Sequence, residues 1–197
     1  LKLSVFCQIM TGKNTDFQQN IIASGSASVQ KFTLHTGGRL IDLRTPKVMG
    51  IINLTPDSFY QSASRYNELP STNQVLKEAE KHLLEGAYFL DLGGYSSRPG
   101  AEDVSEKEEA DRVLPAVKAL AKEFPEAFIS VDTFRLEIAK KSIGEGAHLI
   151  NDISAGQLDE RMFETIAQLQ VPYILMHLKG TPQTMQDLAN YTNLVSE

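Results

Sequence analysis

The chain of 197 residues has 42% hydrophobic residues and a formal net charge of −6, from 19 basic and 25 acidic side chains. That length and apolar content suit one globular domain with a sizeable core. The acidic balance argues against a general nucleic-acid binder, although a local anion site remains compatible with it. The single cysteine excludes an internal disulfide, and no apolar run approaches the roughly 20 residues that span a bilayer. We therefore expect a cytoplasmic protein that binds neither nucleic acid nor membrane.

The first part of the chain predicts an irregular extension followed by a hairpin. Residues 1–30 form no convincing element, and Ala23–Ser28 has the composition of a linker. We assign residues 31–197 to one domain. At its start, apolar alternation in Lys31–His35 and Leu40–Leu43 flanks a Gly-Gly turn, which predicts an antiparallel hairpin. Such a hairpin would close the bottom of a barrel.

Beyond the hairpin, short apolar strands alternate with amphipathic helices. The predicted strands are residues 48–54, 87–92, 128–132, 147–152 and 171–177. The predicted helices cover residues 75–84, 105–121, 135–143 and 159–169, and a further helix is predicted to begin near Asp187 or Tyr191. Ser105 and Glu108 form the sequence signature of a capping box. Strands that alternate with helices in this way form a parallel sheet through right-handed crossovers.

Each predicted strand ends on a polar side chain. These side chains are Asn53, Asp91, Asp132, Asn151 with Asp152, and His177. The carboxyl ends of parallel strands meet at one edge of a sheet or barrel, where active sites of such folds lie. The pattern therefore predicts a shared polar site, and the alternative is a set of strand-end caps and structural hydrogen bonds.

The residue types indicate what such a site could bind. Asn53 is a neutral oxygen ligand that could hold Mg²⁺ beside phosphate oxygens of a substrate. Asp132 could accept two N–H bonds from an amino-substituted heterocycle, and Asn151 can both donate and accept. Ser97 and Arg98 offer a hydroxyl and a guanidinium to anionic oxygen. Together they predict a site for a nitrogen heterocycle and a phosphorylated group.

Five segments carry a resemblance to a known family. They are Met49–Phe59, Asp91–Ala101, Ser130–Thr133, Ile150–Ile153 and Met176–Met185. In this order they resemble the dihydropteroate synthases, the sulfonamide targets of folate biosynthesis. The resemblance implies a (β/α)₈ TIM barrel of the pterin-binding type that joins p-aminobenzoate to 6-hydroxymethyl-7,8-dihydropterin diphosphate. It also implies Mg²⁺ as cofactor and a homodimer for a full-length member.

The resemblance further implies roles for individual residues. Asn53 helps bind Mg²⁺, whereas Asp132, Asn151 and Met176 form the pterin pocket. Two loops serve the other substrate groups. Thr55 and Asp57 lie on a loop that closes over the site, where Asp57 steadies the developing cation. Ser97 and Arg98 lie on the loop that binds the diphosphate and p-aminobenzoate. Asp57 and Arg98 are the predicted catalytic residues.

Three features depart from the family pattern. Ser97 stands where the family often has Thr, and Tyr60–Arg65 replaces a frequent Ser-Asp-Gly-Gly. The sequence from Lys47 to Glu197 supplies about five β/α units, whereas eight units need about 250 residues. The acid, the lysine and the Arg-x-His that the family carries on its last three strands have no counterpart here. We therefore expect this chain alone to be inactive or very weakly active.

Two other functions compete with this interpretation. One is a pterin-binding methyltransferase that uses methyltetrahydrofolate and a corrinoid partner, which would not need the Thr55–Phe59 and Ser96–Gly100 loops. The other is a non-catalytic pterin-binding fragment. Release of diphosphate in the presence of p-aminobenzoate would separate the synthase from both.

Overall fold

The computed structural model describes residues 32–55, 69–96, 103–181, 184–185 and 187–193. The predicted extension at residues 1–30 lies outside this part of the chain, so the division at residue 30 stays a prediction. None of the described helices is both long and apolar enough to cross a membrane.

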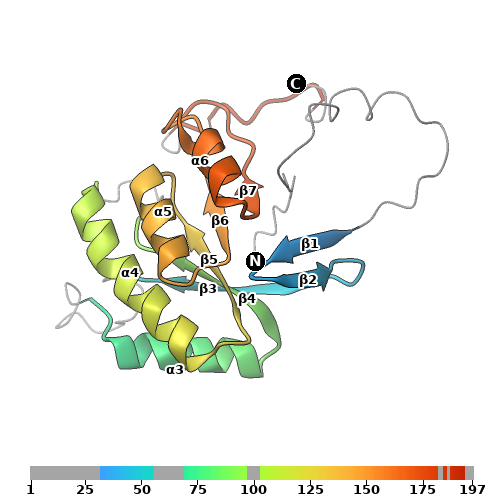
Figure 1. Cartoon of the computed structure of the whole chain (residues 1–197). Coiled ribbons are helices and arrows are strands. Elements are labelled where there is room, and N and C mark those ends of the chain that lie inside the picture. Colours follow the sequence, from blue (N-terminus) through green and yellow to red (C-terminus); the bar gives the residue numbers. More distant parts are fainter. Residues whose placement is uncertain (1–31, 56–68, 97–102, 182–183, 186, 194–197) are drawn as a thin grey trace.

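Five parallel strands form the central sheet, and helices cover one of its faces (Figure 1). The strands are β3 (Val48–Asn53), β4 (Ala87–Gly93), β5 (Phe128–Asp132), β6 (Leu149–Asp152) and β7 (Tyr173–Leu175). The helices are α3 (Thr72–Leu84), α4 (Glu106–Glu123), α5 (Leu136–Gly144) and α6 (Met162–Leu169). The strands pair in chain order, β3-β4-β5-β6-β7, which confirms the predicted alternation.

The boundaries of some elements differ from the prediction. Strand β7 is only three residues long, so Met176 and His177 follow the strand instead of lying in it. Helix α6 begins at Met162, three residues later than predicted, because the segment before it forms turns. A further helix predicted near Asp187 or Tyr191 is not present among the described residues 187–193.

The predicted hairpin is confirmed. Strands β1 (Thr33–Thr36) and β2 (Arg39–Asp42) pair antiparallel, with Gly37 and Gly38 at φ +55° and +71° in the turn. Positive φ at both turn residues suits the right-handed twist of a hairpin and favours glycine.

The hairpin covers the amino ends of the strands on the face opposite the helices. Leu34 and Ile41 are 4% and 1% exposed and pack with Phe89, Phe128 and Leu149 of β4, β5 and β6. This second, smaller cluster closes the bottom of the inner face, as predicted.

Alternation along the strands separates the two faces of the sheet. Leu90, Ile129 and Ile150 point toward the helices and are fully buried in the main core. On the inner face, the apolar residues at the amino ends give way to polar ones two residues further along. Asp91, Ser130 and Asn151 follow Phe89, Phe128 and Leu149 at that spacing. The inner face is therefore apolar toward the amino ends of the strands and polar toward their carboxyl ends.

Helix α4 begins with the predicted capping box. The Ser105 hydroxyl accepts from Glu108 N, and Ser105 N donates to the Glu108 carboxylate at 3.1 Å. These bonds satisfy backbone donors that would otherwise be unpaired in the first turn, and they fix where the loop after β4 becomes helix.

Within the described residues, β3 and β7 are the two edges of the sheet. On β3, Val48 and Ile51 are 62% and 61% exposed, although both are apolar. An open parallel edge with exposed apolar side chains is an aggregation hazard, as expected for five units of a barrel.

Candidate active site

Four residues form one row across the carboxyl ends of β3 to β6. Asn53 pairs in register with Gly93, Gly93 with Asp132, and Asp132 with Asn151. Residues in register on parallel strands project to the same face of the sheet. The structure thus brings the predicted side chains Asn53, Asp132 and Asn151 together on the inner face.

Gly93 leaves a gap in this row. A Cβ atom at Gly93 would lie 3.7 Å from Asp132 Oδ2 and 3.9 Å from Asn53 Oδ1. A carboxylate oxygen and an amide oxygen therefore border the space above the glycine backbone. Because Gly93 has no side chain, a planar ligand or a cation can approach the sheet there.

Asn53 is exposed and supplies one neutral oxygen. Among the described residues no three His, Cys, Asp or Glu side chains are grouped to hold a metal ion. This donor set fits Mg²⁺ only where phosphate oxygens and water supply the other ligands, which is the usual arrangement for that ion.

Asp91 lies behind the row, two residues before the end of β4. It is 5% exposed, and its Oδ2 accepts a 3.0 Å hydrogen bond from Asn151 Nδ2. Among the described residues, Asp91 Oδ1 and the buried Ser130 hydroxyl have no partner with the geometry of a hydrogen bond. Burial raises the pKa of Asp91, and the nearby Ser130 and Asn151 groups oppose that rise.

Asp132 is the one acid in this row of four residues. Burial raises its pKa well above the usual range, and the negative charges of Asp91, Glu109 and Asp152 raise it further. A ligand that donates N–H bonds to this group would relieve the repulsion among these carboxylates.

The prediction that Asp152 belongs to the polar site is wrong. Asp152 follows Ile150 on the face toward the helices and is fully buried. Its carboxylate accepts from Ser154 N at 2.7 Å, from Gly156 N at 2.9 Å and from the Tyr173 hydroxyl. It fixes the turn after β6, which is the structural role that the alternative reading of strand-end residues anticipated.

Three other predicted residues lie near the carboxyl ends of the edge strands. Thr55 is 6% exposed two residues beyond the end of β3. Met176 is half-buried after β7, with its N–H donated to Asp152 O at 3.1 Å. His177 is exposed, and its Nε2 lies 3.1 Å from the Tyr191 hydroxyl.

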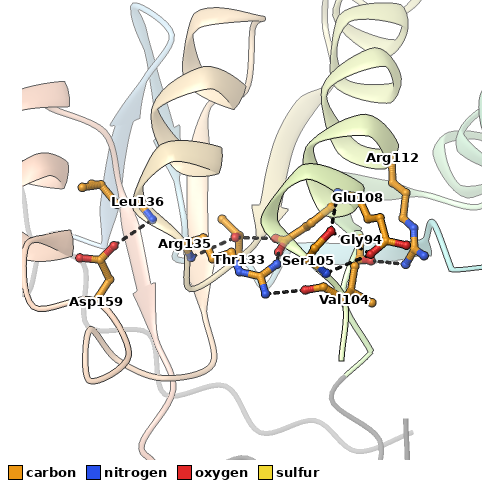
Figure 2. Close-up of polar contacts among 10 residues, drawn as sticks. Gly94, Val104, Ser105, Glu108, Arg112, Thr133, Arg135, Leu136 and Asp159 are labelled. Atoms are coloured by element: carbon orange, nitrogen blue, oxygen red, sulfur yellow. Dashed lines mark hydrogen bonds and ion pairs between the residues drawn. The ribbon is translucent and has the colours of Figure 1, made fainter. Parts of the chain in front are cut away.

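A buried ionic network fixes the loops after β4 and β5 (Figure 2). Glu109 of α4 accepts from the Thr133 hydroxyl at 2.6 Å and from Arg135 Nη1 at 2.5 Å. Arg135 Nη2 also donates to Val104 O at 2.5 Å. Thr133 follows Asp132 directly, so the network fixes the backbone beside the site. Sequence reasoning missed it because Glu109 stands in an acidic run that reads as a solvated helix face.

The same helix also holds the start of the loop after β4. Arg112 Nη1 donates to Gly94 O at 2.9 Å (Figure 2). A Cβ at Gly94 would lie 2.7 Å from Val113 Cγ2, so only glycine allows this close approach to α4. The predicted residues Asp57, Ser97 and Arg98 lie outside the described residues, and their roles stay predictions.

A family model described as "Pterin binding enzyme" matches residues 49–197, which is more than half of the chain. The chain belongs to the pterin-binding enzyme family. Its relatives within that family include dihydropteroate synthases. The synthase of Synechocystis sp. is 43% identical over 150 residues, which cover 76% of this chain and 50% of that relative. The chain thus spans about half the length of this relative.

Solved structures agree with the family assignment. The dihydropteroate synthase of Yersinia pestis, in a sulfonamide complex, gives a TM-score of 0.71 at 42% identity and covers 83% of this chain and 57% of its own. That of Xanthomonas albilineans with 4-aminobenzoic acid gives 0.65 at 35% identity, covering 76% and 54%. The predicted fold class, an α/β barrel of the pterin-binding type, is confirmed, and the described part holds five of its strands.

Proposed function

We propose that the protein is a dihydropteroate synthase of folate biosynthesis. In that reaction the amine of p-aminobenzoate attacks the methylene carbon of 6-hydroxymethyl-7,8-dihydropterin diphosphate. A C–N bond forms, the C–O bond to diphosphate breaks, and the amine loses a proton. The observation that carries the proposal is the row of Asn53, Asp132 and Asn151 on the inner face of a pterin-binding family member.

The chemistry of this row suits a pterin. Asp132 as a carboxylate accepts N–H bonds from an amino-substituted ring, and Asn151 pairs with a ring edge that both donates and accepts. Met176 gives the pocket an apolar wall. We propose the same roles for these residues in substrate binding, with Thr55 at the start of the closing loop.

The main barrier of the reaction is the separation of charge as diphosphate leaves. Bound Mg²⁺ would stabilise that leaving group, with Asn53 as its protein ligand. We assign Ser97 and Arg98 to the diphosphate and p-aminobenzoate, and Asp57 to the developing positive charge on the pterin. Preorganised charges of this kind commonly provide the largest share of catalysis.

Two further parts of the proposal concern the cellular compartment and the oligomeric state of the protein. A single cysteine suits a reducing compartment such as the cytoplasm. A homodimer follows from the family resemblance, and sedimentation of the protein in its full reading frame tests it.

Turnover tests the function. Diphosphate release is measured with both substrates and Mg²⁺, for the 197-residue chain and for the protein in its full reading frame. We expect release by the full reading frame, dependent on p-aminobenzoate, and little or none by the chain alone. Pterin binding without release in either protein would identify a non-catalytic pterin binder. Methyl transfer from methyltetrahydrofolate would identify the methyltransferase.

A further inference from the structure

The hydrogen bond between Asp91 and Asn151 crosses an intervening strand. Asp91 on β4 pairs in register with Ser130 on β5, whereas Asn151 on β6 pairs with Asp132. The bond therefore runs diagonally across the inner face of β5, where the small Ser130 side chain leaves room for it. Ser130 is fully buried.

This bond fixes the orientation of the Asn151 amide. The Asn151 NH₂ group donates to Asp91 Oδ2 at 3.0 Å, and an ionised Asp91 can only accept, so this contact holds the amide in one orientation. Asn151 then has its Oδ1 and one remaining N–H available for a ligand. Without Asp91, rotation by a half-turn would exchange the oxygen and nitrogen at little cost.

Asp91 is an unfavourable residue for stability at this position. It is 5% exposed, and its Oδ1 has no hydrogen-bond partner among the described residues. A buried carboxylate with an unsatisfied oxygen destabilises the folded state. Its one hydrogen bond of good geometry goes to Asn151 of the proposed pterin pocket, with the Ser130 hydroxyl close by, which points to a role in binding and not in packing.

We propose that Asp91 is a positioning residue that holds the Asn151 amide with its oxygen toward the ligand, so that the site selects a ring N–H over a bare ring nitrogen. This inference rests on the proposed function. The ring of 7,8-dihydropterin carries a hydrogen on N8 beside a bare N1, which complements an amide oxygen and an amide N–H. The oxidised pterin ring has bare nitrogens at both places and leaves the fixed oxygen unpaired.

Calorimetry with two ligands tests the selectivity. We measure the affinity of the wild type, Asp91→Asn and Asp111→Asn for 6-hydroxymethyl-7,8-dihydropterin and for the oxidised 6-hydroxymethylpterin. Asp111→Asn makes the same chemical change at an exposed position on α4. We expect the wild type and Asp111→Asn to prefer the reduced ring by about tenfold or more. Asp91→Asn should lose most of that preference while its melting temperature is unchanged or higher.

The side-chain amide spectrum tests the orientation without a ligand. In ¹⁵N-labelled protein, one Asn151 amide proton should be shifted downfield and exchange slowly. Both features should weaken in Asp91→Asn, because an asparagine there can present either its oxygen or its NH₂ group to Asn151. The resonance is assigned by its loss in Asn151→Ala.

The possible results separate the two proposals. If Asp91→Asn loses affinity equally for both rings and has a lower melting temperature, Asp91 has a packing role and the inference is overturned. A wild type that binds both rings equally would also overturn it. A wild type that binds neither ring would overturn the pterin site and the selectivity together. In that case the amide spectrum still decides whether Asp91 orients Asn151.

Discussion

Glu109 is a fully buried carboxylate whose charge is balanced by Arg135 at 2.5 Å. Replacing Arg135 by Met would leave this carboxylate buried without its cation. Removing one partner of a buried ion pair costs about 3–5 kcal/mol. The Arg135 side chain is 18% exposed, so water already screens the pair in part, and we expect about 3 kcal/mol, near the lower end of that range.

The destabilisation should depend on pH. Burial raises the pKa of Glu109, while its bonds to Thr133 and Arg135 oppose the rise. Arg135→Met removes part of that opposition, so the pKa rises further. A carboxyl group with a raised pKa in the folded state binds its proton more tightly when folded, and stability is lost as pH rises through the unfolded and then the folded pKa. The defect of Arg135→Met should therefore be larger at about pH 8 than at about pH 5.

Urea unfolding of the purified protein at both pH values measures these free energies. The control is Lys107→Met, because Lys107 and Asp111 form an ion pair on the same helix with side chains 84% and 60% exposed. An exposed pair contributes about 0.5 kcal/mol or less. In a double variant, Glu109→Leu with Arg135→Met, most of the lost stability should return. Equal effects of Arg135→Met and Lys107→Met, or a larger defect at the lower pH, would refute the reasoning.

Three further substitutions test the packing around the site and below it. Gly94→Ala should lower stability by about 1–3 kcal/mol through the contact with Val113, and Val113→Ala should restore part of it in thermal melts. Ile41→Ala in the hairpin should cost about 2–5 kcal/mol of stability, whereas its neighbour Leu40, which is 70% exposed, should tolerate alanine. Similar unfolding midpoints for the two variants would contradict the role of the hairpin in closing the bottom of the inner face. Tyr173→Phe removes the hydroxyl that donates to the buried carboxylate of β6 and should cost about 1–3 kcal/mol, which chemical denaturation can measure.

Sequence pattern located the strand ends of the site better than it assigned their roles. Asn151 and Asp152 are adjacent and both polar, so the pattern of polar strand ends assigned both to the site. The pleat sends them to opposite faces, and the hydrogen bonds to Ser154, Gly156 and Tyr173 show which one is structural. Asp91 was recognised as a strand-end acid, but its link to Asn151 spans 60 positions of sequence and needed the sheet register.

The sequence by itself determined the order of elements, the hairpin and the capping box at Ser105, because these depend on local periodicity and on side chains a few residues apart. The motifs also determined the family. Only the tertiary structure decided that Glu109 and Arg135 form a buried pair and that Asp91 reaches across β5 to Asn151. Both contacts join different elements of the chain. Their existence depends on sheet curvature, strand register and helix packing, which no local pattern encodes.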